Sequence, residues 1–168
     1  MEENKMEIQK HDTNFESIRF VIRAMDKEKL TKYNCIYVDD TKIETTNGHH
    51  LHRIENTIQL EPGFYTVTKN TKTKIILEKT DIRSRWPDTD RVFPRGECKE
   101  IDIVFSNGNE SIPYTKFIRE LSEERTINFD YFEALNDLDH YTAKIFDDNQ
   151  AILFENNIAK ALIMPMRI

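Results

Sequence analysis

Glycine and proline are scarce in this sequence, with four Gly and five Pro among 168 residues. Such low numbers exclude a collagen-like repeat and a low-complexity linker, and they leave no Gly-rich loop that could cradle a phosphate. Neither a P-loop nor a dinucleotide-binding fingerprint occurs. The sequence therefore does not predict a nucleotide-binding protein of these two classes.

Cysteine is equally rare, because only Cys35 and Cys98 occur and they form no C-x-x-C pair. Their separation argues against a disulfide framework and a thiolate zinc site, and favours a reducing, cytoplasmic setting. The N-terminus is too polar for a signal peptide, and the longest apolar run is too short to cross a bilayer. We therefore expect a cytoplasmic protein that does not contact membranes.

Positive charge is also in deficit, since 24 Lys and Arg against 30 Asp and Glu give a net charge of −6. This balance excludes a generally basic nucleic-acid-binding surface, so any contact with DNA must come from a local basic face. A length of 168 residues predicts one compact domain or two very small ones.

The first 80 residues predict one helix followed by an antiparallel meander. Residues 1–13 are charged and aperiodic, which is typical of a loose tail or an edge strand. From Asn14, apolar residues recur at spacings of three and four, as in an amphipathic helix. Another side of this helix carries a basic ridge formed by Arg19, Arg23 and Lys27. Short strand-like segments with turn signals between them follow at 35–38, 42–46, 51–54, 63–68 and 74–78.

The remainder of the chain predicts a second helix-and-meander unit. Residues 81–100 are charged and aperiodic, with two prolines, and are interpreted as a connector between halves 14–80 and 101–168. The second half predicts helices at 111–124 and 129–138, and strands at 101–105, 141–146, 151–155 and 159–164. The fold class is α+β, with a helix-plus-meander unit that occurs twice.

Four separated segments resemble the bacterial DNA polymerase III beta subunit, the sliding clamp. Residues 46–51, T-N-G-H-H-L, are similar to T-D-G-H-R-L of the clamps, and residues 86–94, W-P-D-T-D-R-V-F-P, to F-P-D-Y-R-R-V-L-P. Residues 129–135, F-D-Y-F-E-A-L, loosely resemble the helix start F-N-x-x-Y-L-x-x-A-L. Residues 163–168, I-M-P-M-R-I, nearly match the C-terminal V-M-P-M-R-L of the family. The four segments follow one another in the order that the family shows.

The resemblance implies a DNA-clamp-like fold whose helices line the DNA side and whose sheets form the outside. It also implies a groove in which partner proteins dock a short hydrophobic motif. Matched position by position, the groove residues would be Thr46, Gly48, His49, His50, Leu51, Pro87, Arg91, Val92, Leu162, Met164, Pro165, Met166 and Arg167. This composition suits such a groove, because methionine side chains re-pack around varied apolar partners.

The sequence also departs from the clamps. A clamp subunit has three domains, whereas the length of this chain predicts about one clamp domain, or one and a half. The helix expected at 129–138 carries Asp130, Glu133 and Asp137 where a DNA-facing helix is expected to carry Lys or Arg.

We predict a non-enzymatic, clamp-like processivity factor without a cofactor or metal. It would bind double-stranded DNA non-specifically through Arg19, Arg23 and Lys27, dock short hydrophobic motifs of DNA polymerase or repair proteins, and form a homo-oligomeric ring. The alternative is a monomeric adaptor or decoy that keeps the groove but does not encircle DNA.

A third alternative is a metal-dependent enzyme built on Asp39, Asp40 and the histidines at 49, 50 and 52. The segment Y-V-D-D at 37–40 is better interpreted as a turn. No carboxylate or thiol ligand is placed beside the histidines by sequence spacing.

Overall fold

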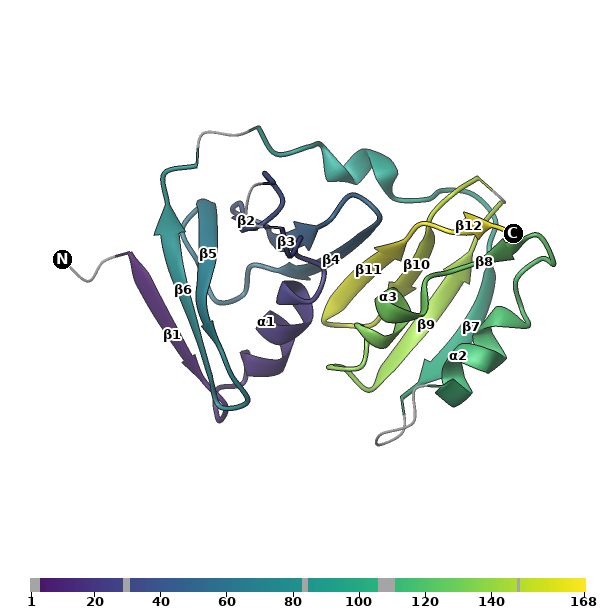
Figure 1. The fold of residues 1–168 in the computed structure, drawn as a ribbon, viewed down its shortest axis with the longest axis horizontal. Helices are drawn as coiled ribbons and strands as arrows, with labels where there is room; N and C mark the ends of the chain where they lie inside the picture. Colours follow the sequence, from purple (N-terminus) through teal and green to yellow (C-terminus); the bar gives the residue numbers. More distant parts are fainter. Residues whose placement is uncertain (1–3, 29–30, 83–84, 106–110, 148) are drawn as a thin grey trace.

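The computed structural model describes residues 4–28, 31–82, 85–105, 111–147 and 149–168. Three residues of the tail expected at 1–13 and two residues of the expected connector lie outside these ranges. Ten of the strands form one curved antiparallel sheet in the order β1-β6-β5-β2-β3-β4-β11-β10-β9-β7 (Figure 1).

The first half of the chain contributes six of these strands and the second half contributes four. The first six are β1 (Lys5–Gln9), β2 (Ile36–Val38), β3 (Lys42–Thr46), β4 (His50–Glu55), β5 (Gly63–Asn70) and β6 (Lys74–Thr80). The other four are β7 (Lys99–Val104), β9 (His140–Ile145), β10 (Ile152–Glu155) and β11 (Ala159–Ile163). A separate two-stranded sheet joins β8 (Arg125–Thr126) to β12 (Met166–Arg167). The helices are α1 (Phe15–Ile22), α2 (Ser111–Ile118), α3 (Phe129–Glu133) and the 3-10 turn η1 (Thr89–Val92).

The predicted strands are confirmed, with bounds that differ by at most two residues. These strands could be predicted from the sequence because their segments are rich in β-branched and aromatic residues and are separated by turn-forming residues. Residues 5–9 form the edge strand β1, which pairs with β6. The α+β fold class is confirmed as well.

The predicted helices are too long. The helix expected at 111–124 ends at Ile118, and the helix expected at 129–138 ends at Glu133. In both cases the chain leaves the α-helix through bonds from residue i to i−3, such as Leu121 N to Ile118 O and Asn136 N to Glu133 O. Such tight turns keep the following apolar side chains buried without continuing the helix. In the described part of the chain, no helix has the length and apolarity needed to span a membrane.

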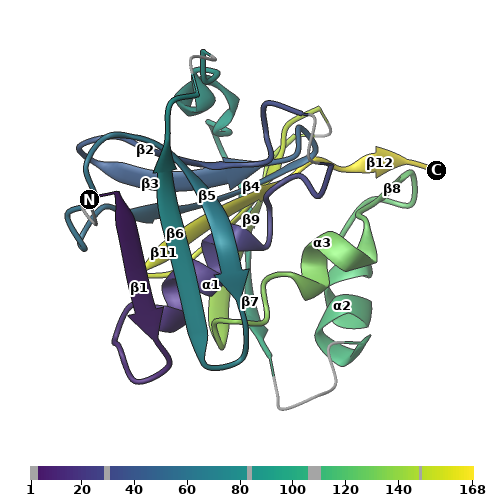
Figure 2. The ribbon, with the colours of Figure 1, turned by 60° about the vertical axis from the view of Figure 1, so that its left-hand side comes forward.

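The two halves join where β4 pairs with β11, and we call this junction the seam. Leu51 lies opposite Leu162, and His52 lies opposite Ala161. Because side chains alternate between the faces of a strand, Leu51 and Arg53 lie on one face and His52 on the other. Figure 2 shows the three helices on one side of the central strands and the segment between β6 and β7 on the other. We call these sides the helix face and the connector face.

The main hydrophobic core lies between the sheet and the helices. Fully buried aromatic rings dominate it, namely Phe15, Phe20, Phe117, Phe132, Tyr141 and Phe154. Burial of large aromatic side chains supplies much of the stabilisation of a small core. This one core spans both halves, so the seam is part of a continuous interior.

An ion pair connects the halves at the margin of this core. Arg23 donates from Nε and Nη2 to the two carboxylate oxygens of Asp137, at 2.8 and 3.2 Å. Arg19 Nε lies 3.9 Å from the same carboxylate, whose side chain is 5% exposed. Two residues of the predicted basic ridge are therefore engaged by an acidic residue of the other half. The third, Lys27, lies beyond the end of α1, so the ridge does not extend along one helix.

We expect Arg23→Ala to lower the free energy of unfolding by about 1 kcal/mol, because the largely buried Asp137 loses its two-pronged donor. Arg23 is 40% exposed, which keeps the expected effect small. The measurement is urea denaturation, with Lys27→Ala as the control because this exposed lysine has no ion pair in the described ranges. If both variants unfold at the urea concentration of the wild type, the pair does not stabilise the junction.

Candidate peptide-binding groove

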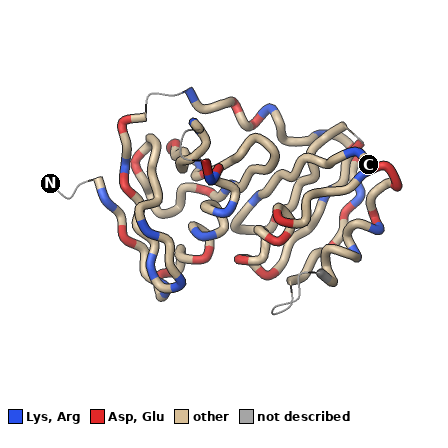
Figure 3. Tube along the Cα trace, viewed as in Figure 1, with Lys and Arg blue, Asp and Glu red and all other residues tan. Residues whose placement is uncertain are grey.

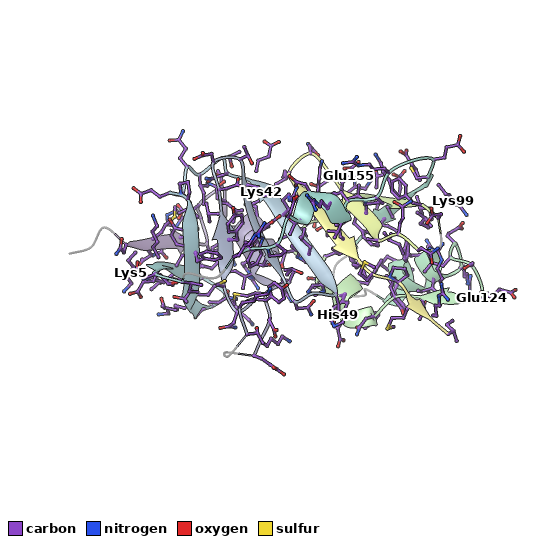
Figure 4. The ribbon with its side chains drawn as sticks, turned by 90° about the horizontal axis from the view of Figure 1, so that it is seen from above. Lys5, Lys42, His49, Lys99, Glu124 and Glu155 are labelled. Carbon is purple, nitrogen blue, oxygen red and sulfur yellow. The ribbon has the colours of Figure 1, made fainter. Side chains whose placement is uncertain are left out.

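A cavity of about 180 Å³ lies at the seam on the connector face, and we call it the seam groove. Four separate segments surround it: the loop between α1 and β2, the turn between β3 and β4, the connector, and the ends of β10 and β11. Figure 4, seen from above, places His49 at the middle of the molecule between the two halves. The lining residues are Tyr33, Thr46, Gly48, His49, His50, Leu51, Pro87, Asp88, Thr89, Val92, Ala151, Leu162 and Met164.

The floor of the seam groove is apolar and is built on strands. Leu51 and Leu162, which face each other across the seam, form a small buried cluster with Ala151 and Leu153. This cluster is separate from the main core, because it lies on the connector face of the sheet. At the edge of the groove, Val92 and Met164 remain 54% and 44% exposed. The groove therefore presents accessible apolar side chains above a rigid apolar base.

The turn between β3 and β4 forms one wall. Gly48 has a φ of +91°, a conformation that residues with a Cβ rarely adopt. The Thr46 hydroxyl donates to His50 O at 2.6 Å and accepts from Gly48 N at 3.0 Å. The Asn47 side chain accepts from the N–H groups of His49 and His50, at 2.9 and 3.1 Å. These bonds leave His49 exposed at the rim and keep His50 buried.

The connector forms the second wall, and a buried carboxylate holds it in place. Glu44 in β3 is 0% exposed and accepts three hydrogen bonds. They come from Arg53 Nε at 2.7 Å, Trp86 Nε1 at 2.8 Å and Thr89 Oγ1 at 2.6 Å. Since Trp86 and Thr89 belong to the connector, the carboxylate fixes this segment against the sheet.

Arg53 extends this arrangement to the next turn of the connector. Its Nη2 donates to Thr89 Oγ1 at 2.8 Å, and its Nη1 lies 2.7 Å from a carboxylate oxygen of Asp90. The hydrogen bond from Arg53 lowers the pKa of Asp90 below its ordinary value. The guanidinium also lies 4.4 Å from the ring centroid of Phe93. We call Glu44, Arg53, Trp86, Thr89 and Asp90 the Glu44 network.

We expect Glu44→Ala to lower the free energy of unfolding by about 3 kcal/mol, because the buried Thr89 hydroxyl and the partly buried donors of Arg53 and Trp86 lose their acceptor. Trp86 is the single tryptophan of the sequence and stacks on Tyr37 with centroids 5.2 Å apart, so its emission reports on the connector. The emission maximum should move to longer wavelength in Glu44→Ala. Asp90→Ala is the control, since the Asp90 side chain is 67% exposed and its removal should leave the emission in place. An unshifted spectrum in Glu44→Ala would contradict this role.

Two neutral histidines of β4, His52 and the groove-lining His50, lie on the helix face of the strand. The His52 ring stacks on Phe20 at 4.2 Å, and its Nδ1 lies 2.6 Å from Phe20 O, so Nδ1 carries the proton. The His50 ring contacts the Tyr131 ring edge-on, with centroids 3.9 Å apart. Burial lowers the pKa of His50 to about 4 and that of His52 to about 3. Both imidazoles are therefore uncharged at neutral pH.

These histidines predict a loss of stability in mild acid. An unfolded histidine binds a proton near pH 6.5, whereas His50 and His52 bind one only near pH 4 and 3 when folded. The stabilisation is therefore complete above pH 6.5 and is lost as the pH falls below it. Between pH 7 and 5 the two groups together should lower the free energy of unfolding by about 4 kcal/mol.

Denaturant titrations at several pH values test this expectation. His52→Asn retains a donor for Phe20 O but does not titrate, so it should remove about half of the change between pH 7 and 5. His49→Gln alters an exposed imidazole and serves as the control. A flat profile in the wild type would show that folding does not lower the pKa of the buried histidines.

Among the residues of the alternative metal-dependent enzyme, Asp39 has a structural role in the observed fold. Asp39 Oδ1 accepts hydrogen bonds from the N–H groups of Thr41 and Lys42, at 2.8 and 2.9 Å, and so caps the turn between β2 and β3. Across the described ranges, no three His, Cys, Asp or Glu side chains lie close enough together to hold a metal ion.

The structure brings nine of the thirteen residues expected in a groove around one cavity. The other four are Arg91, Pro165, Met166 and Arg167, and they do not line it. Arg91 Nε lies 2.9 Å from the exposed Asp88 carboxylate, and Met166 and Arg167 form β12 against β8. Four lining residues were not expected from the sequence. Asp88 and Thr89 lie inside the segment 86–94 that resembles the clamps, whereas Tyr33 and Ala151 lie outside every segment with such a resemblance.

Comparisons with known proteins show what the fold is. No protein-family model and no curated protein matches the sequence. Solved structures of bacterial sliding clamps do match. The beta subunit of Borrelia burgdorferi DNA polymerase III, in complex with a natural product, has a TM-score of 0.60 and 16% identity, over 100% of this chain and 64% of that one.

Two further clamps give the same result. The Thermotoga maritima beta subunit has a TM-score of 0.65 and 12% identity, over 98% of this chain and 66% of that one. The Pseudomonas aeruginosa sliding clamp bound to griselimycin has a TM-score of 0.55 and 16% identity, over 98% of this chain and 65% of that one. The chain thus spans about two thirds of the length of these clamps and has their fold. The expectation of a clamp-like fold is confirmed.

Proposed function

We propose that this protein is a non-catalytic, clamp-like factor of DNA replication or repair that docks short hydrophobic motifs of partner proteins in the seam groove. One observation carries the proposal: residues from three distant segments, each singled out by resemblance to the clamps, line a single cavity. Two of the clamps with this fold have a bound compound, a natural product in one and griselimycin in the other.

The chemistry of the groove suits a small apolar anchor. Its volume of about 180 Å³ lies below the roughly 300 Å³ at which pockets for whole small molecules begin. A groove of this size can take up a side chain such as leucine or phenylalanine while the rest of the peptide stays at the rim. The rim offers polar partners for the peptide in the exposed residues His49 and Asp88.

Contact with double-stranded DNA is the second part of the proposal. Arg19, Arg23 and Lys27 would provide non-specific contacts with phosphates on the helix face. A homo-oligomeric ring is supported by the ends of the sheet, because within the described residues β1 and β7 each pair with one strand only. Their residues Lys5 and Lys99 lie at opposite ends of the molecule (Figure 4). Such free edges can pair between copies.

A monomeric peptide-binding adaptor or decoy is the second candidate function. It is favoured by the pairing of Arg19 and Arg23 with Asp137, which weakens the field that the ridge presents to a phosphate. Light scattering at micromolar concentration separates the candidates, since a ring requires an oligomer and an adaptor does not.

The groove is tested by a matched pair of methionine variants. A short synthetic peptide with a polar residue followed by leucine and phenylalanine should bind with a Kd in the micromolar range, about −8 kcal/mol. Met164→Ala should weaken binding about tenfold, whereas Met166→Ala should leave it unchanged. The two side chains are equally exposed, at 44% and 45%, but only Met164 lines the cavity. Calorimetry that detects no binding to the folded wild type, or equal losses in both variants, would remove the proposal.

A further inference from the structure

A cluster of lysines lies at the free end of the hairpin formed by β5 and β6. It consists of Lys10, Lys69, Lys72 and Lys74, and we call it the lysine tip. Strand pairing brings these residues together, because Gln9 lies opposite Lys74 and Lys10 N donates to Thr73 O at 2.9 Å. The turn is closed by a hydrogen bond from Thr71 N to Lys74 O at 2.9 Å.

The lysine tip is positively charged in a protein whose net charge is −6. Residues 66–76 contain three lysines and no acidic residue. Glu7 lies 2.7 Å from Lys74 Nζ, and Asp12 accepts a hydrogen bond from Gln9 N at 2.6 Å. Figure 3 shows the positive positions gathered at this end of the hairpin.

Three of the four ammonium groups are free to meet a ligand. Lys10, Lys69 and Lys72 are exposed, and none of them forms an ion pair within the part of the chain that the structure describes. The arginines of the basic ridge differ in this respect, because both share the Asp137 carboxylate. The lysine tip is therefore a less compensated group of cations than the ridge.

The position of the lysine tip leaves the groove accessible. Figures 1 and 2 show the end of this hairpin on the side of α1, away from the connector that forms a wall of the groove. The end of β1 at the lysine tip also leads directly into α1, which begins at Phe15. A polyanion held here would lie on the helix face and would not compete with a peptide in the groove.

We propose that the lysine tip is a contact for the phosphate backbone of double-stranded DNA. The inference rests on the proposed function only in naming DNA as the polyanion. Lysine ammonium groups on an exposed hairpin act as mobile point charges, which suits contact with phosphates irrespective of sequence. Each phosphate that is neutralised releases counterions, so the contact has a measurable dependence on salt.

The test is fluorescence anisotropy of a labelled DNA duplex, titrated with protein over a range of salt concentrations. The variant carries Lys10→Glu, Lys69→Glu and Lys72→Glu. We expect its affinity at about 0.1 M salt to fall at least tenfold, and the slope of log K against log salt to fall in magnitude by about 2 to 3. The matched control carries Arg85→Glu, Arg95→Glu and Lys160→Glu, the same change of charge at exposed positions of the connector and β11. It should retain most of the affinity.

Glutamine substitutions at the same three lysines keep the test valid if the glutamate variant unfolds. They remove the charges without adding repulsion and should lower the affinity to an intermediate level. A thermal melt of each variant checks that it is folded.

Three outcomes would overturn the proposal and are distinguishable from one another. If tip variants bind as the wild type does, while Arg19, Arg23 and Lys27 variants lose binding, the lysine tip fails and the DNA function stands. If tip and control variants lose binding equally, the effect reflects net charge and not this site. If the wild type binds no duplex, both the proposed role of the lysine tip and the proposed DNA function are wrong. The peptide titration then tests the proposed peptide-binding function of the groove independently.

Discussion

The arrangement of the connector face depends on one buried carboxylate. A charged group that is withdrawn from water destabilises the fold unless its hydrogen bonds are fully replaced. For Glu44 the replacements come from Arg53 on the neighbouring strand and from Trp86 and Thr89 on the connector. The connector must therefore cross the sheet at this place, and Pro87 and Val92 are positioned beside the seam as a consequence.

The seam satisfies a different requirement on each of its two faces. On the helix face, His50 and His52 are neutral and packed among aromatic rings, where a charge would be unfavourable. On the connector face, Leu51 meets Leu162 and forms the floor of a cavity. Alternation along β4 is what separates these environments, so a one-residue shift in register would exchange them. The seam groove is thus a direct product of the register between the two halves.

The sequence predicted the local structure and the three groove segments, but not the contacts between distant segments. Strands such as 42–46 were readable because β-branched residues and turn signals act over a few residues. Resemblance then identified Leu51, Val92 and Met164 as groove residues. By contrast, the hydrogen bond from Thr89 to Glu44 joins residues that are 45 positions apart in the sequence. The hydrogen bond from Arg23 to Asp137 joins residues that are 114 positions apart. The hydrophobic periodicity of a sequence contains no information on such pairs.

The pairing of Asp137 with the α1 arginines changes how the charge of the protein is interpreted. Acidic residues at 130–137 conflict with a helix face that meets DNA, if each charge is considered by itself. The structure shows one of them, Asp137, largely buried against Arg23 and Arg19. These two arginines compensate the negative charge of Asp137 within the protein. Asp137 therefore repels an approaching phosphate less than an exposed carboxylate would, but the two arginines also attract it less. Attraction for a polyanion then depends on cations that have no internal partner, and the lysine tip supplies such cations on the same side of the sheet.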